Sequence, residues 1–82
     1  MRINIRAPIW SKKAIGIAER KARDSSDEFF EIDILYTDKS GNKTFPGLYQ
    51  IRREDIFKYP IQTLKGGVKL FIIPIEELQL IN

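Results

Sequence analysis

Residues 29–37 carry the strand pattern that most constrains the fold of this chain. Apolar side chains occupy every second position, and the positions between them are mostly acidic: Phe30, Ile32, Ile34 and Tyr36 against Glu31, Asp33 and Leu35. A period of two places each set on its own face of a strand. Aromatic and β-branched residues also pack well on a pleated surface. The segment therefore predicts a β-strand with one face in a core.

A second strand is expected to pair with this one in a hairpin. Asp38-Lys39-Ser40-Gly41 has turn composition, because Asp38 can bond the backbone ahead of it and Gly41 can adopt positive φ. The next strand begins at Asn42 and continues through Leu48 to Ile51. Pro46-Gly47 interrupts it, which predicts a bulge or an edge position.

Further elements are predicted on both sides of this hairpin. Ile3 and Ile5 alternate with three polar residues, which predicts a short strand with a basic outer face. Residues 68–73 are almost wholly apolar, so we expect that strand in the middle of a sheet. Gly66-Gly67 precedes it as a turn. Short helical turns are expected at 53–58, limited by Pro60, and from Pro74 through Leu78.

Residues 11–24 fit two interpretations. In a helix, Ser11 would cap and a mostly alanine face would form. In a strand, Ile15 and Ile17 would face the core together. Gly16 costs a helix up to about 1 kcal/mol, and the alanine face would bury little. The sequence therefore favours a strand, and a helix over 12–23 remains the alternative.

These elements predict one domain over residues 1–82, mainly β in class. We expect about five strands, largely antiparallel, forming a small curled sheet or barrel with one or two short helical turns. The alternative is an α+β fold with the 12–23 helix packed on a four-stranded sheet.

The chain contains no cysteine and no histidine. It therefore lacks thiolate nucleophiles, the usual general base near neutral pH and the commonest ligands of transition metals. Glu31 and Asp33 share a strand face and are suited to Mg²⁺ or Ca²⁺, but no spaced ligand set accompanies them, and a solvated acidic face is favoured. We expect no enzyme activity, no cofactor and no metal.

Positive charge is concentrated in the first third of the chain. Residues 1–25 hold seven basic and two acidic side chains, a balance of +5, although the whole chain has a net charge of +3. Basic side chains neutralise phosphates, and an exposed tryptophan offers a stacking surface for single-stranded bases. Solubilising charges around a buried tryptophan are the plainer interpretation. The candidate nucleic-acid-binding residues are Arg2, Arg6, Trp10, Lys12, Lys13, Arg20, Lys21 and Arg23.

Two functions follow from these patterns. The first is a non-catalytic binding module that contacts nucleic acid through its basic N-terminal face. The second is a protein-interaction or assembly subunit, for example a homodimer, that uses an exposed edge strand near Pro46 or an apolar patch. No segment approaches the roughly 20 apolar residues of a membrane helix. We expect a cytoplasmic protein with no membrane contact.

Overall fold

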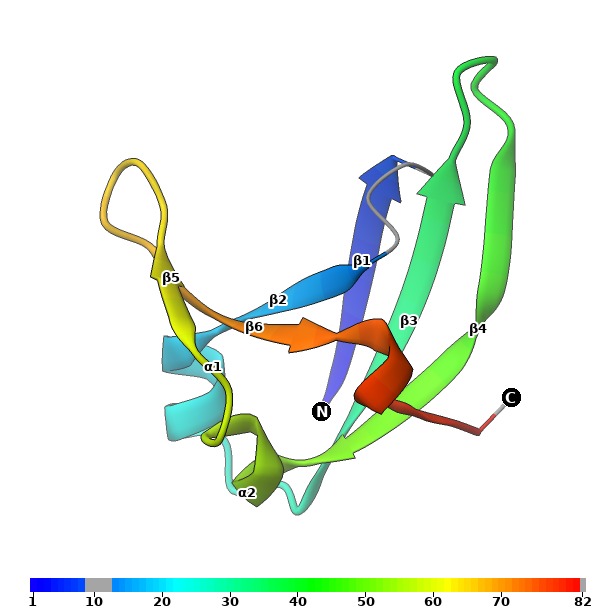
Figure 1. The fold of residues 1–82 in the computed structure, drawn as a ribbon. Coiled ribbons are helices and arrows are strands. Elements are labelled where there is room, and N and C mark those ends of the chain that lie inside the picture. Colours follow the sequence, from blue (N-terminus) through cyan, green and yellow to red (C-terminus); the bar gives the residue numbers. More distant parts are fainter. Residues whose placement is uncertain (9–12, 82) are drawn as a thin grey trace.

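Strands make up most of the chain in the computed structural model, which describes residues 1–8 and 13–81 (Figure 1). The mainly β class is confirmed. The strands are β1 (Arg2–Pro8), β2 (Ala14–Ala18), β3 (Phe29–Thr37), β4 (Lys43–Arg52), β5 (Ile61–Thr63), β6 (Lys69–Pro74) and β7 (Gln79–Leu80). The helical elements are α1 (Glu19–Asp24), α2 (Arg53–Ile56) and the 3₁₀ turn η2 (Ile75–Glu77).

The described strands form two sheets and no closed barrel. The long sheet has the order β1-β3-β4-β7, and the short sheet has the order β2-β6-β5. β2 and β6 run across β1 and β3 in Figure 1, so the two sheets cross one another. This is the geometry of an orthogonal β-sandwich, in which the inner faces of both sheets share one core.

The long sheet contains the predicted hairpin. β3 and β4 pair antiparallel, and their register shifts opposite residues 34–36, close to Pro46-Gly47, as the sequence predicts for a bulge. β1 pairs with β3 in parallel, which is the one parallel pairing among the described strands. It is possible because β2 and α1 lie between the two strands in the chain and form a long enough crossover.

Residues 14–24 contain both of the elements that the sequence left open. The strand interpretation is confirmed over β2, where Ile15 and Ile17 face the core. A helix of six residues, α1, follows directly, with Ala22 buried and Glu19 in its first turn. The change of period within eleven residues leaves each pattern too short to be recognised alone.

The core lies between the inner faces of the two sheets. β3 contributes Phe30, Ile32, Ile34 and Tyr36, all of them buried as the alternation predicts. The short sheet contributes Ile15, Ile17, Phe71 and Ile73 from the opposite side. Phe57 packs edge-on against Phe71, with ring centroids 5.5 Å apart. The helices α1 and α2 add Ala22 and Ile56 to this layer, and Leu78, which directly follows η2, is also buried in it.

β6 occupies the centre of the short sheet, as its apolar sequence predicts, with β2 on one side and β5 on the other. β5 pairs with β6 from Ile61 opposite Phe71 to Thr63 opposite Lys69. The turn that connects β5 to β6 extends away from the rest of the molecule (Figure 1). All side chains from 60 to 69 are exposed.

Candidate functional site

The basic residues predicted to bind nucleic acid lie on three separate elements. Arg2 is in β1, where its guanidinium donates a hydrogen bond to Glu31 Oε2 at 2.9 Å and the pKa of Arg2 is raised as a result. Lys13 directly precedes β2, whereas Arg20 and its neighbours follow β2 on α1. A strand of five residues spans about 17 Å. Lys13 therefore lies a strand length from the basic residues of α1.

The structure brings Arg20, Lys21 and Arg23 together on α1 alongside two acidic residues. Arg23 pairs with Glu19 at 3.1 Å and Arg20 pairs with Asp24 at 3.6 Å, both with i,i+4 spacing. The Arg23 guanidinium also lies 5.4 Å from the ring centroid of Phe57. The excess of positive charge on this helix is therefore only one unit.

The side chains of three candidate residues are not described by the structure. Trp10 and Lys12 fall in residues 9–12, outside the described part of the chain, and the side chain of Arg6 is likewise not described. The nucleic-acid interface thus stays a prediction from sequence.

The acidic outer face of β3 forms one ion pair with β1, between Glu31 and Arg2. Glu31 accepts the hydrogen bond from Arg2, and Asp33 lies opposite Asn4 in the register of β1. Within residues 1–8 and 13–81, no group of three acidic, histidine or cysteine side chains is arranged to hold a metal ion.

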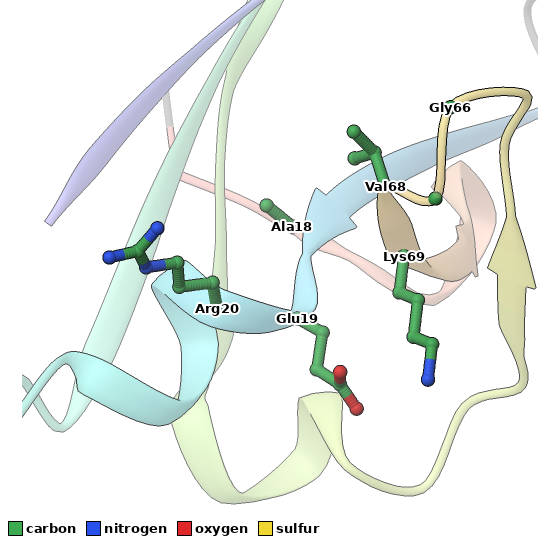
Figure 2. A pocket seen from close by; sticks show the side chains of 7 residues that line it. Ala18, Glu19, Arg20, Gly66, Val68 and Lys69 are labelled. Atoms are coloured by element: carbon green, nitrogen blue, oxygen red, sulfur yellow. The ribbon is translucent and has the colours of Figure 1, made fainter.

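A shallow hollow opens where β2 ends and β6 begins (Figure 2). Its lining is Ala18, Glu19, Arg20, Gly66, Gly67, Val68 and Lys69. The glycine turn is closed by a hydrogen bond from the Gly67 amide to the Leu64 carbonyl at 3.0 Å, and both glycines have positive φ. Figure 2 shows Glu19 and Lys69 pointing to one side and Arg20 pointing away from both. The charged groups do not converge, so this hollow lacks the geometry of a phosphate cradle.

The outer face of the short sheet is the surface that the sequence analysis did not identify. Along β2 and β6, inward buried residues alternate with outward ones that are exposed or partly exposed, and β5 continues this face into the hairpin. Figure 2 shows Val68 pointing to the side of the chain opposite Lys69. We call this surface the apolar outer face; it consists of Ala14, Gly16, Ala18, Leu64, Val68, Leu70, Ile72 and Pro74, with Gln62 as its one polar member.

The two sheets differ in the chemistry of their outer faces. The outer face of the long sheet mixes apolar side chains with charged and amide ones, namely Phe29, Leu35 and Leu48 with Arg2, Asn4, Glu31, Asp33, Gln50 and Arg52. That is the usual composition of a sheet face in contact with water. The apolar outer face has no charged member, and Leu64 and Val68 on it are 41% and 53% exposed.

Charged residues lie at the edge of the apolar outer face. Lys13 and Glu76 line a second hollow together with Ala14 and Pro74 at one end. Arg20 lines the first hollow at the other end, and Lys65 lies in the hairpin turn. The rim therefore holds three positive side chains against Glu76 and Asp24, which is paired with Arg20, and all five are exposed.

A signal for this face is present in the sequence. Strands that are covered on both faces are apolar at consecutive positions, and residues 70–73 read Leu-Phe-Ile-Ile. The pattern correctly placed β6 at the centre of its sheet. The same pattern implies a cover on each face, whereas in this chain the long sheet covers only the inner one.

No protein-family model, curated protein or solved structure matches this chain, so what the surface does is inferred from its own residues. Among the described residues, no helix has the length and apolar character needed to cross a membrane.

Proposed function

We propose that this protein is a non-catalytic protein-interaction module that binds a partner through the apolar outer face. One observation carries the proposal. The central strand β6 is apolar on both of its faces from Leu70 to Pro74, and the outer face that it shares with its neighbouring strands has no charged residue. Burying apolar surface contributes about 25 cal/mol per Å². A partner that covers Leu64, Leu70 and Ile72 therefore gains affinity without any charged group having to be desolvated.

The accessible surface of the chain supports this proposal. The surface measures 5574 Å², whereas a monomer of 9.6 kDa is expected to expose about 5,100 Å². The projecting part of the hairpin, residues 60–69, is one source of the excess, because all of its side chains are exposed. An ordered hairpin that makes so few contacts within its own chain is suited to making contacts with another.

The non-catalytic part of the proposal depends on the residue types available. With no imidazole and no thiol in the chain, acid–base or nucleophilic chemistry near neutral pH would need a strongly shifted lysine, tyrosine or carboxylate. The two tyrosines whose pKa is raised, Tyr36 and Tyr59, are shifted mainly by burial. A raised pKa makes a tyrosine a weaker source of phenolate.

We also propose that the module works in the cytoplasm. The chain has no cysteine, so its folding requires no disulfide and no oxidising compartment.

Site-specific photo-crosslinking in the cell that makes the protein tests the interaction function. A photoreactive residue in place of Leu64 should yield discrete crosslinked species. The same residue in place of Phe45, which is 51% exposed but lies on β4, is the matched control and should yield few. Identical crosslinking patterns at the two positions would show that the apolar outer face has no special role.

Nucleic-acid binding is the second candidate function, and one observation favours it. Arg20 and Lys69 line the same hollow, and Lys65 lies in the adjoining turn, so the hairpin adds positive charge to that of α1. A phosphate interface loses affinity steeply as salt rises. Titration with single-stranded oligonucleotides across a salt series tests it, with an Arg20→Ala, Lys21→Ala variant expected to bind more weakly than an Arg52→Ala control. An absence of binding at low salt would exclude this function.

A further inference from the structure

We infer that the apolar outer face receives a single amphipathic helix of a partner protein, with acidic residues beside its apolar stripe. The inference rests on the proposed interaction function and specifies the partner. A sheet that is apolar on both faces is stable when a layer covers each face. The long sheet supplies the inner layer, and a partner helix on the outer face completes a three-layer arrangement.

The dimensions of the face fit one helix. β6 has six residues and is therefore about 20 Å long, and three strands spaced by about 4.8 Å give a width of about 14 Å. An α-helix with its side chains is about 10–12 Å across, and about 13 residues span 20 Å. Hollows at the two ends of β2, beside Ala14 and beside Ala18, leave room for side chains of a helix that runs along the strands.

The charges on the rim favour an acidic helix. Lys13, Arg20 and Lys65 stand at both ends and at the hairpin tip, against Glu76 at one end and Asp24 beside Arg20 at the other. Arg20 is paired with Asp24, but this pair is 3.6 Å long and its arginine side chain is 92% exposed, so it contributes little and is easily exchanged. Acidic residues along the flanks of a bound helix would lie near this positive rim, whereas basic ones would be repelled.

A second copy of the chain fits the face less well. Its own rim is also positive, so face-to-face packing brings like charges together. A second copy offers no suitable helix either, since α1 and α2, the α-helices of the described chain, have six and four residues.

Three synthetic peptides of about 14 residues test the inference by isothermal titration calorimetry with the full chain. The first has a leucine stripe at i, i+3, i+4 and i+7 with glutamate flanks. The second keeps the stripe but has lysine flanks, and the third is the acidic peptide in scrambled order. We expect the acidic amphipathic peptide to bind about tenfold more tightly than either of the others, with the advantage over the lysine peptide shrinking between about 0.1 M and about 1 M salt.

Variants of the chain locate the binding site. Leu64→Lys and Ile72→Lys each place a charge on the apolar outer face and should weaken the acidic peptide by about tenfold or more. Leu64 is exposed, so its variant keeps the fold even if Ile72→Lys disturbs it. Phe45→Lys is the matched control and should bind as the unmodified chain does.

Three results would each overturn the inference. Equal affinity for the acidic peptide and its scrambled form, or undiminished binding by Leu64→Lys, would exclude an amphipathic helix at this face. A chain that sediments as a dimer and becomes monomeric on Leu64→Lys would show that a second copy occupies the face instead. If the helix inference fails in one of these ways, crosslinking that is specific to position 64 would still support the proposed interaction function. An absence of specific crosslinking at position 64 would contradict both the interaction function and the helix inference.

Discussion

Leu70 lies across Gly16 on the outer face of the short sheet. A Cβ atom on Gly16 would come within 2.8 Å of Leu70 Cδ1 and 3.4 Å of Leu70 Cβ. In the register of β2 and β6, Leu70 is opposite Ala18 and Gly16 is opposite Ile72, so the Leu70 side chain reaches diagonally over β2. Glycine in a strand often marks such a close approach. Here the missing Cβ of Gly16 leaves the space that the Leu70 side chain occupies over β2.

Gly16→Ala should leave the fold intact and change the shape of the apolar outer face around Leu70. Leu70 Cδ1 is the free end of a flexible side chain, so it can rotate away from the new methyl group. We expect the free energy of unfolding to change by less than about 1 kcal/mol, since mild overpacking opposes the gain from replacing a strand glycine. Affinity for the acidic amphipathic peptide should fall, because Leu70 then stands above the face. Urea denaturation and peptide titration measure the two effects.

Gly41→Ala is the matched control for this substitution. Gly41 has φ +85° and no atom near its missing Cβ, so the strain is in the backbone alone. It should cost about 1 kcal/mol of stability and leave peptide affinity unchanged. A large loss of stability in Gly16→Ala would contradict the picture of a movable Leu70.

The Arg53 side chain, which extends from α2, donates hydrogen bonds to backbone carbonyls of α1. This geometry predicts that a lysine at position 53 cannot make the same contacts. The Nε of Arg53 donates to the Ala22 carbonyl at 2.6 Å and its Nη2 donates to the Arg23 carbonyl at 3.1 Å. Both carbonyls belong to the last turn of α1, where helical partners are missing. A single ammonium group lacks the fork that serves both oxygens. Arg53→Lys should lower the free energy of unfolding by about 1–2 kcal/mol in urea denaturation.

The neighbouring arginine provides the comparison. Arg52 is half-exposed and pairs with Glu28 at 3.3 Å and with Glu54 at 3.5 Å. Exposed ion pairs of this kind contribute little. Arg52→Lys should change stability by less than about 0.5 kcal/mol, and an effect as large as that of Arg53→Lys would show that charge rather than fork geometry matters.

The hairpin and the central strand could be predicted from sequence because each has one pattern over enough residues. Phe30, Ile32, Ile34 and Tyr36 alternate over a full strand and are all buried. β5 is different: three residues, all of them exposed, leave no pattern to recognise. The parallel pairing of β1 with β3 depends on where the crossover packs, and that is a property of the tertiary structure.

The candidate site was harder to predict, for a reason visible in α1. Composition counts Arg20, Lys21 and Arg23 as a basic cluster, but the turn of the helix places Glu19 close to Arg23 and Asp24 close to Arg20.

The apolar outer face could not be predicted from the alternation of apolar and polar residues alone. An apolar strand such as β6 is expected to have a cover on both sides, and only the fold shows that the described residues, 1–8 and 13–81, provide one of them.

Phe71 should be among the most costly residues to truncate. It is 2% exposed and meets Phe57 edge-on at the centre of the core. Truncating a buried phenylalanine to alanine costs about 3–5 kcal/mol. A domain of this size has a total stability of about 4–12 kcal/mol. Phe71→Ala should therefore lower the thermal midpoint severely, while Phe45→Ala, at a 51% exposed position, should change stability by less than about 0.5 kcal/mol.

The stability of the fold should decline at alkaline pH because of its tyrosines. Burial, followed by the negative charge of Glu77 and a hydrogen bond to it, raises the pKa of Tyr59 above 10.0. Burial likewise raises the pKa of Tyr36. The folded state therefore favours the neutral phenol. This contribution to stability is fully present below the unfolded pKa of about 10 and is lost as the pH rises through the raised folded pKa.

Tyr59→Phe and Glu77→Gln separate the causes of this decline. Tyr59→Phe removes one titrating group, so urea midpoints measured from about pH 9 to about pH 11 should fall less steeply than in the unmodified chain. Glu77→Gln removes the charge that opposes ionisation but leaves the burial of Tyr59 in place. Tyrosinate absorbance should then appear at lower pH, by an amount smaller than the full shift. If Glu77→Gln leaves the titration unchanged, the carboxylate of Glu77 has no influence on Tyr59, and burial alone sets its pKa.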